Sequence, residues 1–257
     1  MAIDVAVLVS IGRHPISSRA RRADADARAV ELALGIAGAN VRLIHAGDPG
    51  EPALRDYMGM GANAVTVLRM APDADPVPAL IAHFSSTKPQ IVLAGTRAEG
   101  GEDSGLVPYL VAQALNTPLV PGIVSLSLAG DRAEMLQGLP RGRRRSLVSP
   151  VPLVATVPVM APAPRMSAFG LARRGTIEVK DVSAQADAAR SGWTEGPARR
   201  RPKRIKVMKA ASAADRVKAV TEMAAGKGKV LQNVPADEAA KAIFDYLVAE
   251  GIIQAKP

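Results

Sequence analysis

The strongest constraint on the fold is an alternation of short apolar runs with helical patterns over the first two-thirds of the chain. Residues 5–10, VAVLVS, form a continuous apolar run, as expected for a strand that is covered on both faces. Similar strand patterns occupy residues 40–46, 64–70 and 90–95, and helical patterns occupy residues 24–37, 52–61, 76–88 and 104–116. This alternation predicts βαβ units with right-handed crossovers, and therefore an α/β fold built on a doubly wound, mostly parallel sheet.

Local signals mark the ends of the first of these helices. Asp24 or Asp26 is expected to cap its N-terminus with a side-chain oxygen. Gly38 and Asn40 are expected to end the helical pattern before the next strand. After Pro118 the pattern becomes rich in strands, with turn signals at 130–131 and 140–142. We interpret this part as a strand and a β-hairpin that extend the same sheet.

Composition narrows the classes of function. The chain has 257 residues, no cysteine and a formal net charge of +9, so thiolate metal sites and thiol nucleophiles are excluded. No apolar run approaches the roughly 18 residues needed to cross a membrane, and we expect a cytoplasmic setting. The basic excess comes from short clusters at 19–22, 141–145, 172–175 and 199–206. These clusters suit nucleic acid, an anionic cofactor or an acidic partner, but few aromatic residues accompany them, which disfavours nucleic acid.

A glycine-rich turn stands where the fourth strand passes into the fourth helix, in GTRAEGGEDSGLVPYLVAQAL, residues 95–115. Ligands of open parallel sheets bind at the carboxyl ends of the strands, and a helix N-terminus there attracts phosphate. Gly100, Gly101 and Gly105 would allow an anion to approach the backbone, and Ser104 would donate its hydroxyl at the start of the helix. The alternative is an ordinary capped turn, in which Asp103 or Ser104 satisfies the first helical amides.

Several segments, in order, resemble the beta subunit of electron transfer flavoproteins across about residues 25 to 180. They are LRDYMGMGANAVTVLRM, KPQIVLAGTRAEGGEDSGLVPYLVAQALNTPLVPGIVSL, EMLQGLPRGRRRSLVSPVPLVATV and APRMSAFGLARRG. The resemblance implies a Rossmann-like, adenine-nucleotide-binding domain at 1–157 that includes the hairpin. It also implies a partner-recognition loop at 158–183, of which residues 164–175 resemble the recognition loop of the family. Beyond the resemblance, residues 184–204 are typical of a surface linker, and alanine-rich helix patterns follow at about 212–225 and 235–250. We therefore expect a basic linker and helical tail at 184–257.

The resemblance further implies the residues of a nucleotide site. In that family the loop after the fourth strand wraps the phosphate of AMP, or of a second FAD in members that bifurcate electrons. The adenine contacts fall on the first strand. The implied nucleotide-binding residues here are Ala6, Val7, Gly95, Gly100, Gly101, Asp103, Ser104, Gly105 and Val107. The chain departs from the family where the basic residue after the first strand is delayed to Arg13, and where RRADADARAVEL replaces the usual Asn-Pro.

The resemblance also implies partners. Phe169, with Leu171 as the alternative, would be the apolar anchor for dehydrogenases, flanked by Arg173 and Arg174. The expected function is that of a beta subunit in a heterodimer with a FAD-bearing alpha subunit, passing electrons from dehydrogenases to a quinone reductase. We expect an electron carrier subunit rather than an enzyme with its own substrate, and we assign no catalytic or metal-binding residues to it. Acyl-CoA, amine and N-methyl-amino-acid dehydrogenases all remain open as donors. Two other functions stay open: a stand-alone nucleotide-binding module of the universal-stress type, and a basic nucleic-acid-binding protein.

Overall fold

The computed structural model describes residues 3–194, 196, 212–215, 217, 231–249 and 253, and the chain divides into two compact units, 1–194 and 195–257. The basic cluster at 199–206 lies outside the described residues, as does most of the helix expected at about 212–225. The second helix expected in the tail is present as α8 (Ala236–Ala249). None of the helices in the described ranges is long and apolar enough to cross a membrane.

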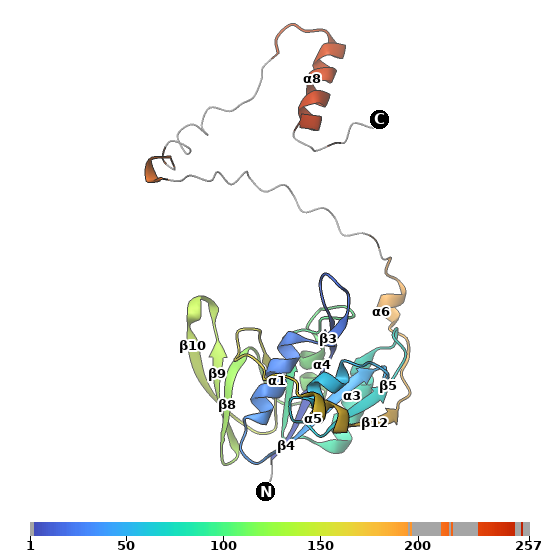
Figure 1. Cartoon of the computed structure of the whole chain (residues 1–257), viewed down its shortest axis with the longest axis vertical. Helices are drawn as coiled ribbons and strands as arrows, with labels where there is room; N and C mark the ends of the chain where they lie inside the picture. The colour runs from blue at the N-terminus through green and yellow to red at the C-terminus, as the bar shows by residue number, and fades with distance from the viewer. Residues whose placement is uncertain are drawn as a thin grey trace. The chain divides into compact units, whose positions relative to one another are not determined.

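The first unit is built on a central sheet of seven parallel strands, which confirms the predicted α/β class (Figure 1). Its strand order among the described residues is β12-β5-β4-β1-β6-β11-β7. The strands are β1 (Ile3–Leu8), β4 (Ala39–Gly47), β5 (Ala64–Arg69), β6 (Ile91–Gly95), β7 (Leu119–Val120), β11 (Leu153–Val157) and β12 (Thr176–Asp181).

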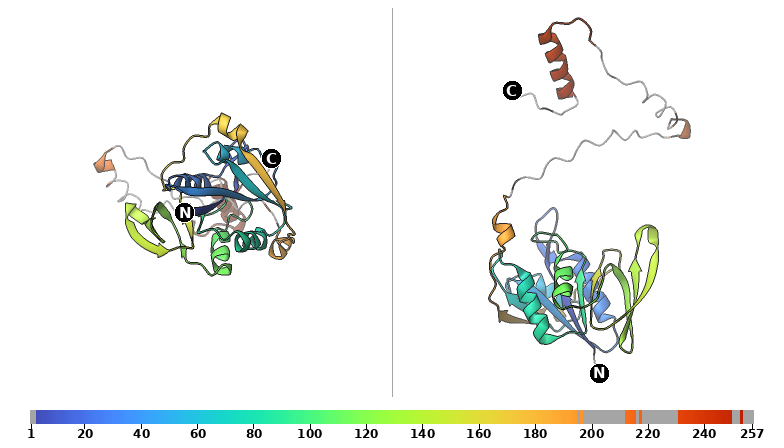
Figure 2. Two further views of the ribbon diagram at one scale, coloured as in Figure 1. Left: turned by 90° about the horizontal axis from the view of Figure 1, so that it is seen from below. Right: turned by 180° about the vertical axis from the view of Figure 1, so that it is seen from behind.

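Helices cover both faces of this sheet, as Figure 2 shows when the unit is viewed from below. One face packs against α1 (Asp24–Leu34) and α2 (Leu54–Met58), with α5 (Phe169–Arg174) beside α2. The other face packs against α3 (Pro76–Thr87) and α4 (Val107–Ala114). The short α6 (Ala188–Ser191) follows β12. The predicted strand and helix patterns up to Asn116 are therefore confirmed as elements, although several helices are shorter than their patterns.

Alternating strand residues feed two separate cores. Val5 and Val7 point into the core beneath α1, whereas Ala6 between them joins the core beneath α3 and α4. Leu43 and Ile44 on β4 divide in the same way. This two-sided burial is the reason why the strands appear as continuous apolar runs in the sequence.

The segment after Pro118 differs from the prediction. β8 (Ile123–Ala129), β9 (Arg132–Gly138) and β10 (Arg144–Pro150) form their own antiparallel sheet, with the 3-10 turn Pro140–Gly142 between the last two. Only β7 and β11 of this region enter the central sheet. The predicted extension of the central sheet by the hairpin is therefore wrong, because β8 to β10 bury one face, including Ala133 and Met135, against the edge of the α1 core.

Two further elements are absent from the predicted pattern. A small hairpin, β2 (Ile11–Arg13) and β3 (Ala20–Arg22), connects β1 to α1. The segment expected to be a recognition loop contains α5 and the edge strand β12, which pairs with β5. β12 is largely exposed, so its sequence TIEVKD lacks the apolar run that identifies the buried strands.

Candidate functional site

A cavity of about 870 Å³ opens at the carboxyl ends of β1, β4, β5 and β6. From β1 the chain adds β4 and β5 on one side and then β6 on the other, so the strand order reverses between β1 and β6. Such a switch point is where open α/β sheets bind their ligands. The volume lies within the range of small-molecule and cofactor sites.

Asp26 joins the two strands at the switch point. One oxygen of its carboxylate accepts hydrogen bonds from the amide and hydroxyl of Ser10, at 2.7 and 2.5 Å. The other oxygen accepts from the amide of Gly95 at 2.9 Å. Burial raises the pKa of Asp26 to about 6, although the hydrogen bonds from Ser10 and Gly95 oppose that rise. The Asp26 side chain therefore fixes the floor of the cavity between the ends of β1 and β6.

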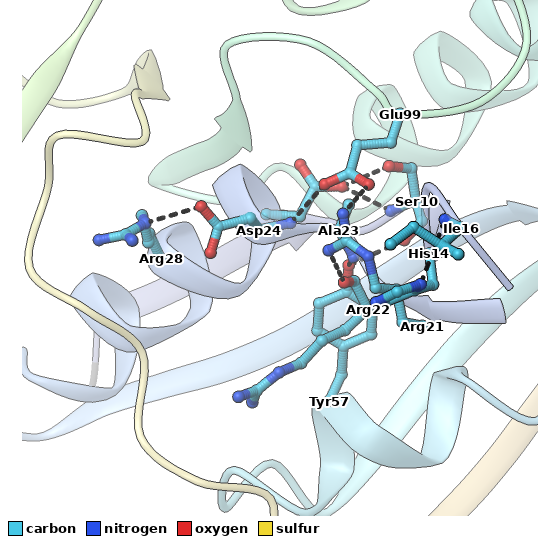
Figure 3. Close-up of polar contacts among 11 residues, drawn as sticks. Ser10, His14, Ile16, Arg21, Arg22, Ala23, Asp24, Arg28, Tyr57 and Glu99 are labelled. Atoms are coloured by element: carbon cyan, nitrogen blue, oxygen red, sulfur yellow. Dashed lines mark hydrogen bonds and ion pairs between the residues drawn. The ribbon is translucent and has the colours of Figure 1, made fainter. Parts of the chain in front are cut away.

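Tyr57 of α2 also holds the backbone at the end of β1, next to the floor of the cavity. The buried hydroxyl of Tyr57 donates to the carbonyl oxygen of Ser10 and accepts from the amide of Ala23, both at 2.8 Å. Figure 3 shows this side chain reaching from α2 towards the backbone between β3 and α1. The end of β1 is thus held by side chains from α1 and α2.

The loop between β6 and α4 forms the wall of the cavity. Residues 101–102 form a turn, and within the described part of the chain no backbone amide of residues 97–105 donates a hydrogen bond of normal length and angle. Gly101, Asp103 and Gly105 have φ values of +67°, +53° and +72°, which turn successive amides in this loop. Clusters of unpaired amides produced by left-handed residues are concave anion sites. The loop therefore offers the donors that a phosphate group needs.

Of the three acidic side chains of this loop, Glu99 lies outside the cavity lining and Asp103, which lines the cavity, is paired with a cation. Glu99 turns away from the cavity, accepts from the amide of Asp24 at 2.8 Å and forms an ion pair with Arg21 at 2.7 Å (Figure 3). Asp103 forms an ion pair with Arg97 at 3.2 Å.

Glu102 is the remaining acidic side chain of the loop. Partial desolvation, followed by the neighbouring carboxylates of Asp187 and Asp75, raises the pKa of Glu102.

Two predictions about helix starts are wrong. The first helix has no side-chain cap from Asp24 or Asp26. Instead, the carboxylate of Glu99, more than seventy residues away in the sequence, accepts a hydrogen bond from the Asp24 amide. The Asp26 side chain points towards the floor of the cavity, where it accepts from the Gly95 amide. The fourth helix begins at Val107 and not at Ser104, whose hydroxyl only accepts from the Leu106 amide at 3.3 Å.

The structure brings together most of the residues predicted for the nucleotide. Seven of the nine line the cavity: Gly95, Gly100, Gly101, Asp103, Ser104, Gly105 and Val107. Ala6 and Val7 lie inside β1, fully buried, and are not among the lining residues. The next residues, Leu8 to Ser10, reach the cavity instead.

Sequence reasoning missed Ser10, Asp26 and His45, all of which line the cavity. For Asp26 the sequence did contain a signal of a special role, because an acidic residue among the alanines of a buried helix face is unusual. His45 closes an apolar strand, and nothing in the local pattern distinguishes it from a structural histidine.

The predicted partner segment at 164–175 exposes its apolar side chains while its backbone is anchored. Phe169 is 79% exposed and Leu171 is 40% exposed, and Arg173 and Arg174 are also exposed. Arg165 is fixed by Glu31, which accepts from its guanidinium and from its amide at 2.9 Å. This pairing holds the pKa of Glu31 below its ordinary value. The segment therefore presents an exposed aromatic side chain on a supported backbone.

Comparison with known proteins agrees with this architecture. Residues 18–186 match the family model of the electron transfer flavoprotein domain. The chain is 47% identical over 258 aligned residues to a protein named electron transfer flavoprotein subunit beta from Chromohalobacter salexigens, and the alignment covers 98% of this chain and 97% of that protein. The residues matched by the family model include the loop at 97–105 and the segment at 164–175. The chain therefore belongs to the electron transfer flavoprotein beta subunit family.

Proposed function

We propose that this beta subunit binds AMP in the cavity at the switch point. The row of unpaired amides at 97–105 is the observation that carries this proposal, because such a row suits the phosphate. The apolar walls of the cavity, which include Leu8, Ile44 and Met70, suit the base. A second FAD is the alternative occupant of the same site, and the nucleotide extracted from the purified protein distinguishes the two.

The proposed partner is an alpha subunit that carries FAD, against which this chain encloses one side of the cofactor. The flavin, when bound, supplies the acceptance and release of electrons, and the beta subunit supplies position and electrostatics. The family membership of the chain supports this pairing. Exposed arginines at the β9–β10 turn and at the start of β10 are available for an anionic surface of such a partner: Arg141, Arg143, Arg144 and Arg145.

The dehydrogenases that donate electrons would dock on the segment at 164–175. A largely exposed aromatic residue costs little to desolvate, and Phe169 beside Arg173 and Arg174 combines an apolar anchor with electrostatic steering. The electrons would then pass to a quinone oxidoreductase.

Co-expression with an electron transfer flavoprotein alpha subunit from the same organism tests the proposed assembly. We expect one alpha and one beta chain to purify together with a flavin absorption spectrum. A beta chain that purifies alone, or a pair that stays colourless after FAD is added, would contradict the proposal.

A further inference from the structure

His45 is a lining residue of the cavity, and one of its ring nitrogens has no hydrogen-bond partner among the described residues. It lies near the end of β4, is 7% exposed, and lines the cavity. Its Nδ1 lies 2.8 Å from the carbonyl oxygen of Val9. A carbonyl oxygen only accepts, so Nδ1 must carry the hydrogen and donate it. In the neutral ring, Nε2 is then a hydrogen-bond acceptor.

The environment of His45 favours the neutral imidazole and leaves Nε2 without a hydrogen-bond donor among the described residues. Burial lowers the pKa of His45, against smaller opposing effects of Val9, Glu51 and Asp48. Within the described residues Nε2 has no hydrogen-bond partner, yet it is not among the fully enclosed unpaired atoms. A β-carbon on Gly47 would lie 2.7 Å from Nε2, so a glycine here preserves the space for the ring.

The rest of the cavity floor is also rich in acceptors. The Ser10 hydroxyl gives its hydrogen to Asp26, so its oxygen retains only accepting capacity. The Asp26 carboxylate accepts as well. The wall at 97–105 offers donors, whereas the floor at Ser10, Asp26 and His45 offers acceptors. This polarity matches a molecule with an anionic end and a donor-bearing end.

The sheet sets the distance between the two ends. β4 and β6 flank β1, so their ends are about 10 Å apart, which is two interstrand spacings. A mononucleotide whose phosphate lies on the loop after β6 reaches β4 with its nucleoside part. Hydroxyl groups of the ribose and the exocyclic amine of adenine are the donors that it would bring there.

We propose that Nε2 of His45 accepts a hydrogen bond from a donor group of the nucleoside, and so determines which nucleotide this site retains. The inference rests on the proposed nucleotide site and adds the residue that discriminates among nucleotides. It assigns recognition of the nucleoside to β4, next to the Ala6–Val7 strand on which the adenine contacts were predicted.

Titration calorimetry on the full chain, after removal of endogenous nucleotide, tests the inference. The ligands are AMP, 2′-deoxy-AMP, 3′-deoxy-AMP and purine riboside monophosphate, which lacks the exocyclic amine. We expect one of these three analogues to bind the wild type about tenfold more weakly than AMP, because it leaves the acceptor unpaired. The weak analogue identifies whether a hydroxyl or the amine contacts His45.

Three variants complete the design. His45→Leu should bind AMP about tenfold more weakly than the wild type and should no longer distinguish AMP from the weak analogue. His45→Gln keeps an acceptor and should retain part of the discrimination. His14→Leu removes an exposed histidine outside the cavity and should match the wild type.

Two results would overturn the inference. The first is a wild type that binds AMP and all three analogues equally well, because His45 then accepts no hydrogen bond from the nucleoside. This measurement needs only the wild type, so it is decisive even where a variant fails to fold. The second is a His45→Leu variant that binds AMP as tightly as the wild type, because the imidazole then contributes nothing to AMP binding. A wild type that binds none of the four ligands would overturn the nucleotide site itself, and the role of His45 with it.

Discussion

The buried carboxylate of Asp26 accepts a hydrogen bond from the backbone amide of Gly95 at 2.9 Å, across 69 positions of sequence. The same carboxylate accepts from Ser10, so one side chain fastens the ends of β1 and β6 together. These ends are the two sides of the switch point. The geometry of the cavity therefore depends on a charged group that burial disfavours.

Asp26 should make the protein less stable as the pH rises from about 4 to 7. Its pKa is raised from 3.8 to about 6 in the fold, so the folded state binds more protons than the unfolded state over this interval. The stabilisation is complete below the unfolded pKa and is lost as the pH rises through about 6. The difference corresponds to about 3 kcal/mol.

Urea unfolding of the wild type and of Asp26→Asn at pH 4, 5, 6 and 7 measures this effect. The free energy of unfolding of the wild type should fall by about 2 kcal/mol relative to that of the variant over this range, because pH 4 already lies just above the unfolded pKa of 3.8. Asp24→Asn, on the same turn of α1, controls for the removal of a carboxylate from the helix start. Parallel curves for the wild type and Asp26→Asn would refute the prediction.

Gly105→Ala should distort the proposed nucleotide-binding loop, residues 97–105, more than Gly101→Ala does. Both residues have positive φ, so either alanine costs about 1 kcal/mol of backbone strain. A β-carbon on Gly105 would also lie 2.7 Å from the carbonyl oxygen of Thr96, whereas one on Gly101 meets nothing within 4 Å. We expect AMP affinity to fall at least tenfold in Gly105→Ala and by less in Gly101→Ala, as measured by calorimetry. Equal affinities in the two variants would show that the shape of the loop at Gly105 is not required.

Glu99→Ala should loosen the loop through the loss of both interactions of this side chain. The bond from the Asp24 amide acts as the cap of α1 and contributes about 1 kcal/mol. The partly exposed ion pair with Arg21 adds less than about 1 kcal/mol. Chemical unfolding should therefore show a loss of about 1–2 kcal/mol for Glu99→Ala.

Glu99→Gln is the matched variant, because its amide oxygen still accepts from Asp24 while the ion pair is removed. It should lose less stability than Glu99→Ala. Glu134→Ala, an exposed glutamate on β9, should leave stability within about 0.5 kcal/mol of the wild type. The prediction fails if all three variants unfold at the same urea concentration.

Phe169→Ala should weaken dehydrogenase docking without affecting the fold. The side chain is 79% exposed, so its removal leaves no cavity. As an aromatic anchor it would contribute more than about 1 kcal/mol to binding, a loss of about fivefold or more in affinity. Ile16→Ala, at a position 90% exposed on the β2–β3 turn, is the control. The rate of heterodimer reduction at limiting dehydrogenase reports the difference, and an unchanged rate in Phe169→Ala would contradict the role of this residue.

The layered fold could be predicted because each central strand is buried on both faces, which leaves an apolar run in the sequence. β12 could not be predicted, since it is an exposed edge strand whose side chains need no apolar pattern. The separate β8–β9–β10 sheet was also missed. Hairpin signals locate turns and pairs, but they do not determine which sheet those pairs join.

The glycine-rich loop of the proposed nucleotide site could be located because a strand-to-helix turn rich in glycine is local in sequence. The floor of the cavity could not, since it is assembled by long-range contacts: Asp26 with Gly95, Tyr57 with Ser10, and Glu99 with the start of α1. The same contacts explain the incorrect helix cap. Asp24 and Asp26 resemble capping residues in sequence, but tertiary partners determine their roles.

The most direct test of this account is the adenine nucleotide content of the purified heterodimer. Denaturation followed by chromatography of the supernatant should release one AMP for each beta chain, in addition to the FAD of the alpha subunit. FAD alone at one per heterodimer, with no AMP and no second FAD, would contradict the central claim that the cavity between β1 and β6 holds a nucleotide.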